Sequence, residues 1–165
     1  MPEDTCRLRT VSANLKAALF AQAIVCFVAG PLFADEYRIV AVLSGIAKVA
    51  DGDGILFGNV EVRLQGIAAP EIGELGGDSS TKNLQQIADG QMIVCHLDGT
   101  TAGRTGRPAG ICYAGSVDIG EYQVSSGKAR DCPAYSRGRY AEVETSARAN
   151  GRDLAAVYAL PEYCN

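Results

Sequence analysis

The sequence predicts a single α+β domain in which short β-strands form a small barrel with helices packed against it. Short apolar stretches separated by Gly, Asp and Asn turns dominate the first half of the chain after residue 34. Helix-patterned stretches alternate with a second pair of strands in the remainder. A length of 165 residues suits one domain with a sizeable core.

The first strands are predicted over 37–43 and 46–50, where apolar and β-branched residues dominate, with a Ser-Gly pair at 44–45 between them. The letters DGDG at 51–54 then predict a turn, because glycine adopts positive φ angles without strain. Apolar residues recur with period two over 55–64, which predicts a hairpin. Together these segments predict a β-meander.

Three helices and a second pair of strands are predicted in the rest of the chain. The helices are expected to run from 79 or 80 to 88, from 118 to 127 and from 136 to 150; the strands cover 91–97 and 109–114, with a loop over 98–106 between them. Asp118 and Glu121 form a capping-box-like start for the second helix, and Gly127 ends it. A meander followed by helices and a hairpin fits an OB-type barrel.

Residues 1–34 have the order of a secretory signal peptide. Basic residues up to Lys16 precede a mostly apolar run over 17–33, and a small residue then precedes charged ones. A transmembrane anchor would need roughly 20 predominantly apolar residues, and the run stops short of this. A lipoprotein processed at Cys26 is a further alternative, although the residue before this cysteine is a valine rather than a small residue. We therefore expect residues 35–165 to form a secreted or periplasmic domain with no membrane segment.

Four cysteines follow the proposed signal peptide, and an even number in an exported chain predicts two disulfides with three possible connectivities. If the strands 91–97 and 109–114 pair antiparallel with Cys95 opposite Cys112, these two form a bridge. Cys132 and Cys164 would then tie the tail to the start of the last helix. No cysteines have CxxC spacing and His96 is the single histidine, so a zinc site is not expected. We expect His96 to face solvent.

The net charge argues against general binding of polyanions. After residue 34 the chain has 12 basic and 17 acidic residues, which is a formal charge of −5. Proteins that bind nucleic acids without sequence preference usually have a positive charge. A local basic cluster remains compatible with this sequence.

One short stretch combines two acids, an arginine in an apolar run and a glutamate after a proline. Asp51 and Asp53 lie in the DGDG turn, Arg63 lies in the next strand, and Glu71 follows it. Carboxylates and a guanidinium brought together by one hairpin suggest a site for a metal and a phosphate. The structural alternatives are that the aspartates only form the turn, that Arg63 pairs with Glu61 or Glu71, and that Glu71 is an ordinary loop acid.

The ordered motifs of the chain resemble the staphylococcal-nuclease-like (thermonuclease) family. They read ADGDG, VRLQGIAAPE, VCHL, TGRPAGICYAGSVDI, VSSGKA and YSRGRYAEVETSARANG, and the similarity spans about Gly45 to Gly151. The ending DCPAYS to LPEYC is similar to an exported bacterial branch of that family. The resemblance implies a five-stranded OB-fold barrel with three helices, and a calcium-dependent phosphodiesterase that hydrolyses DNA or RNA.

The resemblance also implies roles for individual residues. Asp53 matches the first calcium ligand, and Asp51 would lie in the outer shell of that ion. Glu71 matches the glutamate proposed as the base for the attacking water. Arg63 and Arg107 match two arginines that stabilise charge on phosphorus, with Arg104 as a less well-spaced alternative to Arg107; the structural alternative is that Arg107 only solvates a hairpin.

One calcium ligand of the family is missing from this chain. The second aspartate is replaced by Ala68, which has no side-chain oxygen, while Ala69 still offers its backbone carbonyl. Ca²⁺ prefers six to eight oxygens, so we expect weak calcium binding and expect Ala68→Asp to strengthen it. The acids that would replace the missing ligand are Asp51, Glu74 and Asp78.

Two functions follow from the sequence. The first is a secreted, calcium-dependent nuclease with reduced metal affinity, acting as a monomer on nucleic acid. The second is a catalytically silent OB-fold protein of the cell envelope that binds a nucleic acid, saccharide or protein. A small disulfide-bonded envelope protein with no site is a third reading. We expect Tyr113, Tyr135 and Tyr140 to lie in the core or in a groove wall, with nucleobase stacking as the alternative.

Overall fold

The computed structural model describes residues 37–165, so the proposed signal peptide lies outside the described residues. The strands are β1 (Ala41–Ile46), β2 (Lys48–Val49), β3 (Gly54–Phe57), β4 (Val60–Leu64), β5 (Ile67–Ala68), β6 (Met92–Ala102), β7 (Arg107–Ala114), β8 (Val117–Asp118) and β9 (Arg130–Asp131). The α-helices are α1 (Gly77–Ala88), α2 (Ile119–Ser125), α3 (Pro133–Ser136) and α4 (Ala141–Ala149), and the 3₁₀ turns are η1 (Leu154–Ala156) and η2 (Glu162–Cys164). The predicted α+β class is confirmed.

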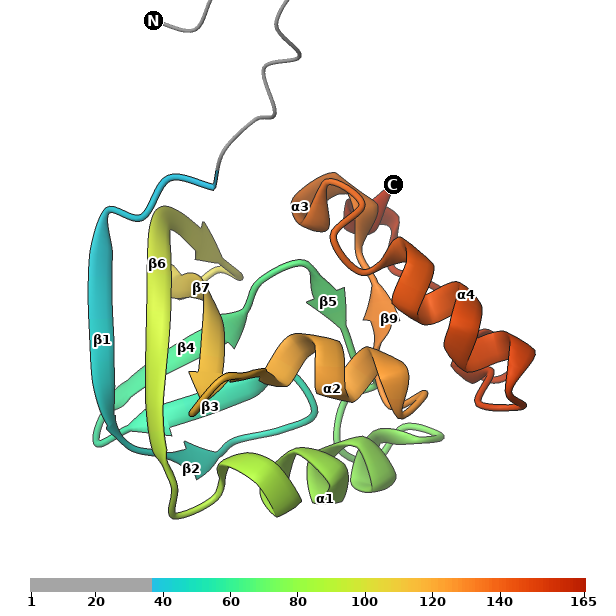
Figure 1. The fold of residues 1–165 in the computed structure, drawn as a ribbon, viewed down its shortest axis with the longest axis horizontal. Coiled ribbons are helices and arrows are strands. Elements are labelled where there is room, and N and C mark those ends of the chain that lie inside the picture. Colours follow the sequence, from blue (N-terminus) through green and yellow to red (C-terminus); the bar gives the residue numbers. More distant parts are fainter. Residues whose placement is uncertain (1–36) are drawn as a thin grey trace, which may run out of the picture. The chain divides into compact units, whose positions relative to one another are not determined.

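The strands form one mixed sheet and one small separate pair. The order in the sheet is β1-β6-β7-β4-β3-β2, with β8 added to β7, while β5 pairs with β9. Neighbouring strands are antiparallel except β4 and β7, which run parallel. Most of the strands lie on one side of the domain, and α1, α2 and α4 lie on the other (Figure 1). The break predicted at 44–45 is wrong, because both residues pair with β6 inside a continuous β1.

The hairpin of β6 and β7 has the predicted register. Cys95 pairs with Cys112, and the two form a disulfide with their Cα atoms 4.0 Å apart. The loop predicted over 98–106 is shorter than expected, because the pairing resumes after a shift in register beyond Leu97 and β6 continues to Ala102. The hairpin therefore extends further from the sheet than its sequence suggests.

The last predicted helix, over 136–150, begins later than expected, as α4 at Ala141, and the short α3 before it was not predicted. Arg137 has a φ of 54° and Gly138 a φ of 83°, and this left-handed backbone separates α3 from α4. The expected number of about three helices is accordingly exceeded by one among the described residues. The predicted start of α2 is confirmed, since the Asp118 side chain accepts from the N–H groups of Gly120 and Glu121.

The core lies between the sheet and the helices. Its members include apolar side chains from β3 to β7, α1 and α2, joined by one tyrosine from the start of α4. The largest of them are Ile55, Val62, Leu64, Ile67, Leu84, Ile93, Ile119, Val124 and Tyr140. Period-two residues of the strands and the helix-spaced residues of α1 supply this set, as their patterns predict.

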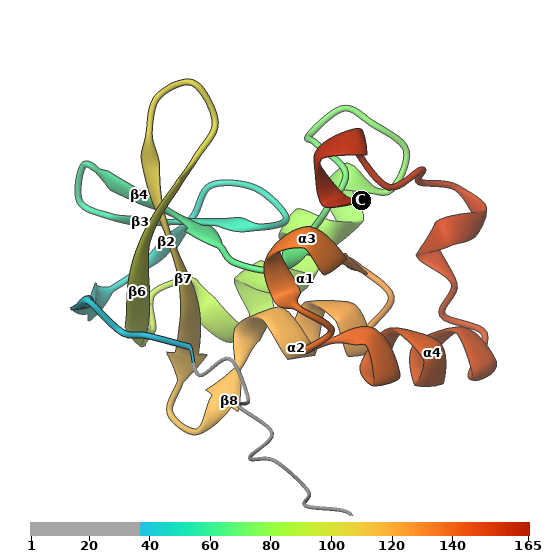
Figure 2. The same ribbon diagram turned by 90° about the horizontal axis from the view of Figure 1, so that it is seen from above.

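A second disulfide joins Cys132 to Cys164, which confirms the other predicted pairing. It brings η2 beside α3 (Figure 2). Disulfides persist in oxidising compartments, so both bridges are consistent with an extracellular or periplasmic protein. In the part of the chain that the structure describes, no helix has the length and apolar character needed to cross a membrane.

The Asp118 carboxylate also accepts hydrogen bonds from the two residues before α4, and its replacement by alanine is expected to lower the free energy of unfolding by about 3 kcal/mol. Its carboxylate accepts from Arg139 Nη2 at 2.9 Å and from the buried Tyr140 hydroxyl at 3.2 Å. Alanine removes the helix cap and leaves that hydroxyl unpaired. Urea denaturation measures the loss. Asp118→Asn keeps an acceptor, so a loss as large as that of alanine would contradict this explanation.

Candidate functional site

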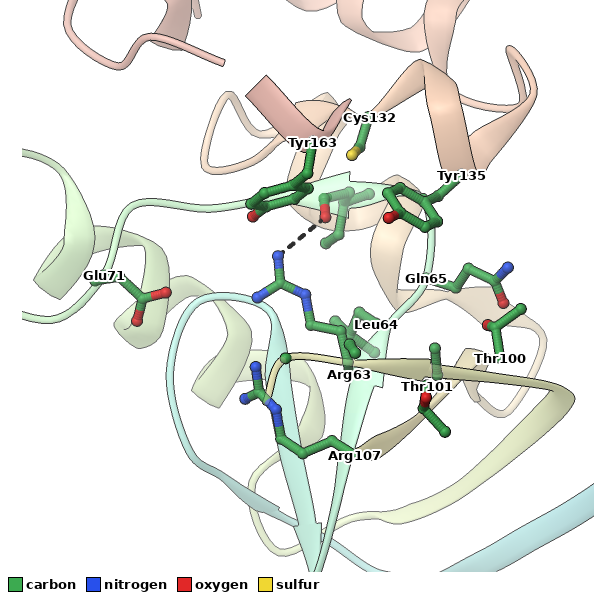
Figure 3. Close-up of a pocket in the computed structure, with 15 residues that line it drawn as sticks. Arg63, Leu64, Gln65, Glu71, Thr100, Thr101, Arg107, Cys132, Tyr135 and Tyr163 are labelled. Atoms are coloured by element: carbon green, nitrogen blue, oxygen red, sulfur yellow. Dashed lines mark hydrogen bonds between the residues drawn. The ribbon is translucent and has the colours of Figure 1, made fainter. Parts of the chain in front are cut away.

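One cavity gathers the arginines and the glutamate that the sequence singles out. Its volume is about 420 Å³. Arg63 reaches it from β4, Glu71 from the loop after β5, and Arg107 from the first residue of β7. The other lining residues include Gln65, Thr100, Thr101, Cys132, Tyr135 and Tyr163. Figure 3 shows both guanidinium groups with the two tyrosine rings on the opposite wall.

The parallel pairing of β4 with β7 explains why the two arginines meet. Arg63 lies opposite Ala109, two residues beyond Arg107. Since the strands run in the same direction, the same register carried two residues back places Arg107 beside Glu61. Arg104 lies in the exposed hairpin turn and does not line this cavity, so Arg107 is the better placed of the two predicted candidates.

The DGDG turn holds Asp53 in the interior. The Asp53 N–H donates to Asp51 Oδ1 at 3.1 Å, which is a local turn of the kind that aspartate favours. Asp53 is only 2% exposed; one of its oxygens accepts from Arg63 Nη1 and the other from the Ala69 N–H at 2.8 Å. Burial raises the pKa of Asp53 to about 7, although the Arg63 guanidinium acts in the opposite direction.

Each arginine has an acidic partner, and the partners differ from those considered from sequence. Arg63 pairs with Asp53 rather than with Glu61 or Glu71, and its Nη2 donates to the Ile67 carbonyl at 3.4 Å. Glu61 pairs with Arg107. Burial by itself lowers the pKa of Arg107. The Glu61 carboxylate, which bonds to the guanidinium, more than offsets this effect, so that the pKa lies above its usual value. Each guanidinium is therefore oriented by an acidic side chain.

Glu71 is exposed at the edge of the cavity. Its backbone N–H donates to Glu74 Oε2 at 3.0 Å, which shapes the loop. Within residues 37–165, no hydrogen bond or ion pair engages the Glu71 carboxylate. Its oxygens thus remain available to accept a proton from a bound molecule.

The position of the missing aspartate is buried. Ala68 is 0% exposed and belongs to an apolar cluster with Cys132 and Cys164, against which Tyr158 and Leu160 pack. Ala69, the expected carbonyl ligand, accepts from the Tyr158 hydroxyl at 3.1 Å. Burial raises the pKa of Tyr158 to about 12, which keeps this donor protonated. The C-terminal tail therefore covers this side of the predicted metal site.

These residues do not form the oxygen cage that calcium prefers. Both oxygens of Asp53 and the Ala69 carbonyl are already hydrogen-bonded within the protein. Asp51 caps the turn and Glu74 holds the loop, whereas Asp78 is exposed in the first turn of α1. Among the described residues, no three His, Cys, Asp or Glu side chains lie close enough to hold a metal ion. Six to eight oxygens would be needed.

The aromatic residues divide between the core and the cavity. Tyr140 is buried, and the ring of Tyr113 lies 5.2 Å from that of His96, a partly exposed residue of β6. Tyr135 lines the cavity, as expected for a residue of a groove wall. Tyr163 also lines it, and sequence reasoning missed this residue. The predicted Cys132–Cys164 bridge was an available signal, because it brings the residue before Cys164 close to α3.

Gly66 allows α3 to approach the end of β4. It has a φ of +80°, and a Cβ atom at this position would lie 2.9 Å from the Ser136 Cα. Its carbonyl accepts from the Cys132 N–H at 2.9 Å. Any side chain here would therefore push α3, together with Tyr135, away from the arginines.

No protein-family model matches this sequence, and no curated protein matches it either.

Proposed function

We propose that this chain is a phosphodiesterase that hydrolyses DNA or RNA, with the scissile phosphate between Arg63 and Arg107. The main support is that three residues from separate segments, Arg63, Glu71 and Arg107, line one cavity. Guanidinium groups match phosphate oxygens in geometry and charge. A barrel that only maintains its fold has no need to direct two arginines and an unpaired carboxylate into the same space.

The ion pairs of both arginines suit this role. Asp53 and Glu61 each engage Nη1 of an arginine, which leaves other N–H groups of each guanidinium for the substrate. Because the acids hold the guanidinium planes in place, little side-chain entropy is lost when a phosphate binds. The acids also reduce the positive charge of the cavity, in agreement with the acidic net charge of the chain.

In the proposed reaction, Glu71 takes a proton from a water molecule whose oxygen forms a bond to phosphorus. The P–O ester bond on the opposite side breaks, and the leaving oxygen takes up a proton from solvent. Arg63 and Arg107 stabilise the negative charge that develops on the phosphoryl oxygens. A positioned general base typically contributes about 10² to 10⁴ in rate.

Calcium stays a prediction with limited support from the donor set. Asp53 and Ala69 are the groups that would contact the ion, and both are bonded within the protein. We propose that any calcium dependence is weak, which a titration of activity with Ca²⁺ measures.

We also propose that the sheet closes into an OB-type barrel. The first and last strands in the sheet order, β1 and β2, are separated along the chain only by Ala47. One continuous stretch of chain therefore pairs with β6 in its first part and with β3 in its second. Export of the domain and a monomeric state are further parts of this proposal.

Hydrolysis of DNA and RNA by residues 35–165 tests the function. We expect activity toward both polymers, measured with added Ca²⁺ and with a chelator, and a fall in kcat of about 10² to 10⁴ for Glu71→Gln. Glu142→Gln makes the same charge change on an exposed residue of α4 and serves as the matched control. Absence of hydrolysis at every calcium concentration, or full activity of Glu71→Gln, would exclude the proposed mechanism.

A catalytically silent binding protein is the second candidate. The burial of Ala68 favours this candidate, because the C-terminal tail covers the position from which a second carboxylate would bind calcium. This candidate predicts binding of a single-stranded oligonucleotide without cleavage. Fluorescence anisotropy with a labelled oligonucleotide, followed by analysis of its length on a gel, separates the two functions.

A further inference from the structure

We infer that Tyr163, held in place by the Cys132–Cys164 disulfide, contacts a nucleobase of the substrate and selects single-stranded nucleic acid. This inference rests on the proposed function, since it assumes a phosphate between the arginines. It concerns the opposite wall of the same cavity, where two tyrosines face that phosphate (Figure 3).

The two tyrosines form an open aromatic wall. The side chains of Tyr135 and Tyr163 are 48% and 55% exposed, and their ring centroids lie 6.4 Å apart at an interplanar angle of 65°. In such an edge-to-face pair, the face of at least one ring remains uncovered. Within residues 37–165, neither hydroxyl takes part in a hydrogen bond. Neither ring is therefore needed to satisfy a polar group of the fold.

The disulfide determines where Tyr163 lies. Cys164 is 0% exposed, and its partner Cys132 lines the cavity beside the tyrosines. In the described chain, the backbone hydrogen bonds of residues 161–165 are local ones inside η2. The closest hydrogen-bonded residue before them is Tyr158, whose hydroxyl donates to the Ala69 carbonyl and whose own carbonyl accepts from Arg130. The position of Tyr163 thus depends on the covalent bond of its neighbour.

A nucleotide fits the two walls of this cavity. Phosphate oxygens suit the Arg63–Arg107 side, and the flat apolar face of a base suits the tyrosine side. A base can stack on a side chain only when it is not stacked and paired inside a duplex. The arrangement therefore favours a single strand, and stacking tolerates every base because all have a π-face.

Binding of two labelled probes tests this role of Tyr163. One probe is a single-stranded oligothymidylate, and the other is an abasic deoxyribose-phosphate chain of the same length. All proteins contain Glu71→Gln, so that no probe is cleaved. With Tyr163 present, we expect the thymidylate probe to bind about tenfold more tightly than the abasic probe. Tyr163→Ala should lose this preference while its affinity for the abasic probe stays unchanged. Tyr163→Phe should keep the preference, because the aromatic ring remains.

A double-mutant comparison tests the disulfide. Cys164→Ser is expected to remove the preference for the thymidylate probe. In a protein that already contains Tyr163→Ala, the same substitution should leave the affinities for both probes unchanged. Thermal unfolding of each variant shows that it is folded at the assay temperature. If Tyr163→Ala keeps the preference, or weakens both probes equally, Tyr163 does not contact a base.

The outcomes separate this inference from the proposed function. Hydrolysis by the protein with Glu71 intact, without any preference between the two probes, would overturn only the role of Tyr163. Base preference in a protein that cannot hydrolyse either polymer would overturn the phosphodiesterase and keep the nucleobase contact.

Discussion

Arg63→Ala is expected to abolish hydrolysis and to lower the free energy of unfolding by about 3 to 5 kcal/mol. The Asp53 carboxylate is 2% exposed, and Arg63 is the cation that pairs with it. Removing the guanidinium leaves the Asp53 carboxyl buried with the Ala69 N–H as its remaining donor, so the carboxyl must either take up a proton or keep an unpaired charge. Urea denaturation measures the loss of stability, and a nuclease assay on the folded fraction measures the loss of activity.

Asp53→Asn in the same background is the matched control. It removes the buried charge, so it is expected to recover part of the stability lost in Arg63→Ala without recovering activity. A coupling energy near zero between the two positions would show that the pair contributes little. Wild-type stability of Arg63→Ala would contradict the structural role that the buried ion pair implies.

Ala68→Asp is expected to destabilise the protein by about 3 kcal/mol or more, although the sequence alone predicted that it would strengthen calcium binding. Ala68 is 0% exposed among Cys132, Cys164 and Tyr158. A carboxylate in this cluster is removed from water, and the Asp53 carboxylate lies nearby, bonded to the next residue along the chain. Thermal or urea denaturation of the variant gives the size of the loss.

The loss in Ala68→Asp is expected to depend on pH with a definite sign. Burial raises the pKa of the introduced carboxyl above its unfolded value near 4. The folded state then binds the proton more tightly, so the deficit is full above the folded pKa and shrinks as the pH falls toward 4. Ala159→Asp places the same group on an exposed part of the tail and should show neither the deficit nor this dependence. A deficit that does not change between pH 8 and pH 5 would contradict burial of the new group.

Calorimetry on Ala68→Asp links stability to the calcium question. If the variant folds and binds Ca²⁺ more tightly than the wild type, the tail must move to admit the ion. If it folds without any gain in affinity, position 68 does not face the metal. Either result shows whether the alanine at position 68 is a cause of the low calcium affinity expected of this chain.

The sequence predicted much of the fold because the relevant signals are local. The turn before β3, the Asp118 cap of α2 and the antiparallel register of Cys95 with Cys112 each depend on a few neighbouring residues or on a short hairpin. The later start of the last helix was missed because Arg137 adopts a left-handed conformation that arginine rarely takes. Tertiary packing decided that conformation.

Within the candidate site, the sequence identified Arg63, Glu71 and Arg107 but not their partners. The acid nearest to Arg63 along the chain is Glu61, and alternation along β4 places both side chains on the same face. In the structure Asp53 takes the buried position beside Arg63, and Glu61 turns to Arg107 on the neighbouring strand. Such a choice depends on burial and on which strands are adjacent.

By itself, then, the sequence determined the α+β class, both disulfides and the two arginines of the cavity, Arg63 and Arg107. Only the tertiary structure decided that Ala68 is covered, that Asp53 is bonded to Arg63, and that Tyr163 belongs to the cavity. The physical reason is that two of these features come from the tail that Cys164 attaches to Cys132, and the third from the buried space that Asp53 shares with Arg63 and Ala69. Local patterns contain no information on how such segments share buried space.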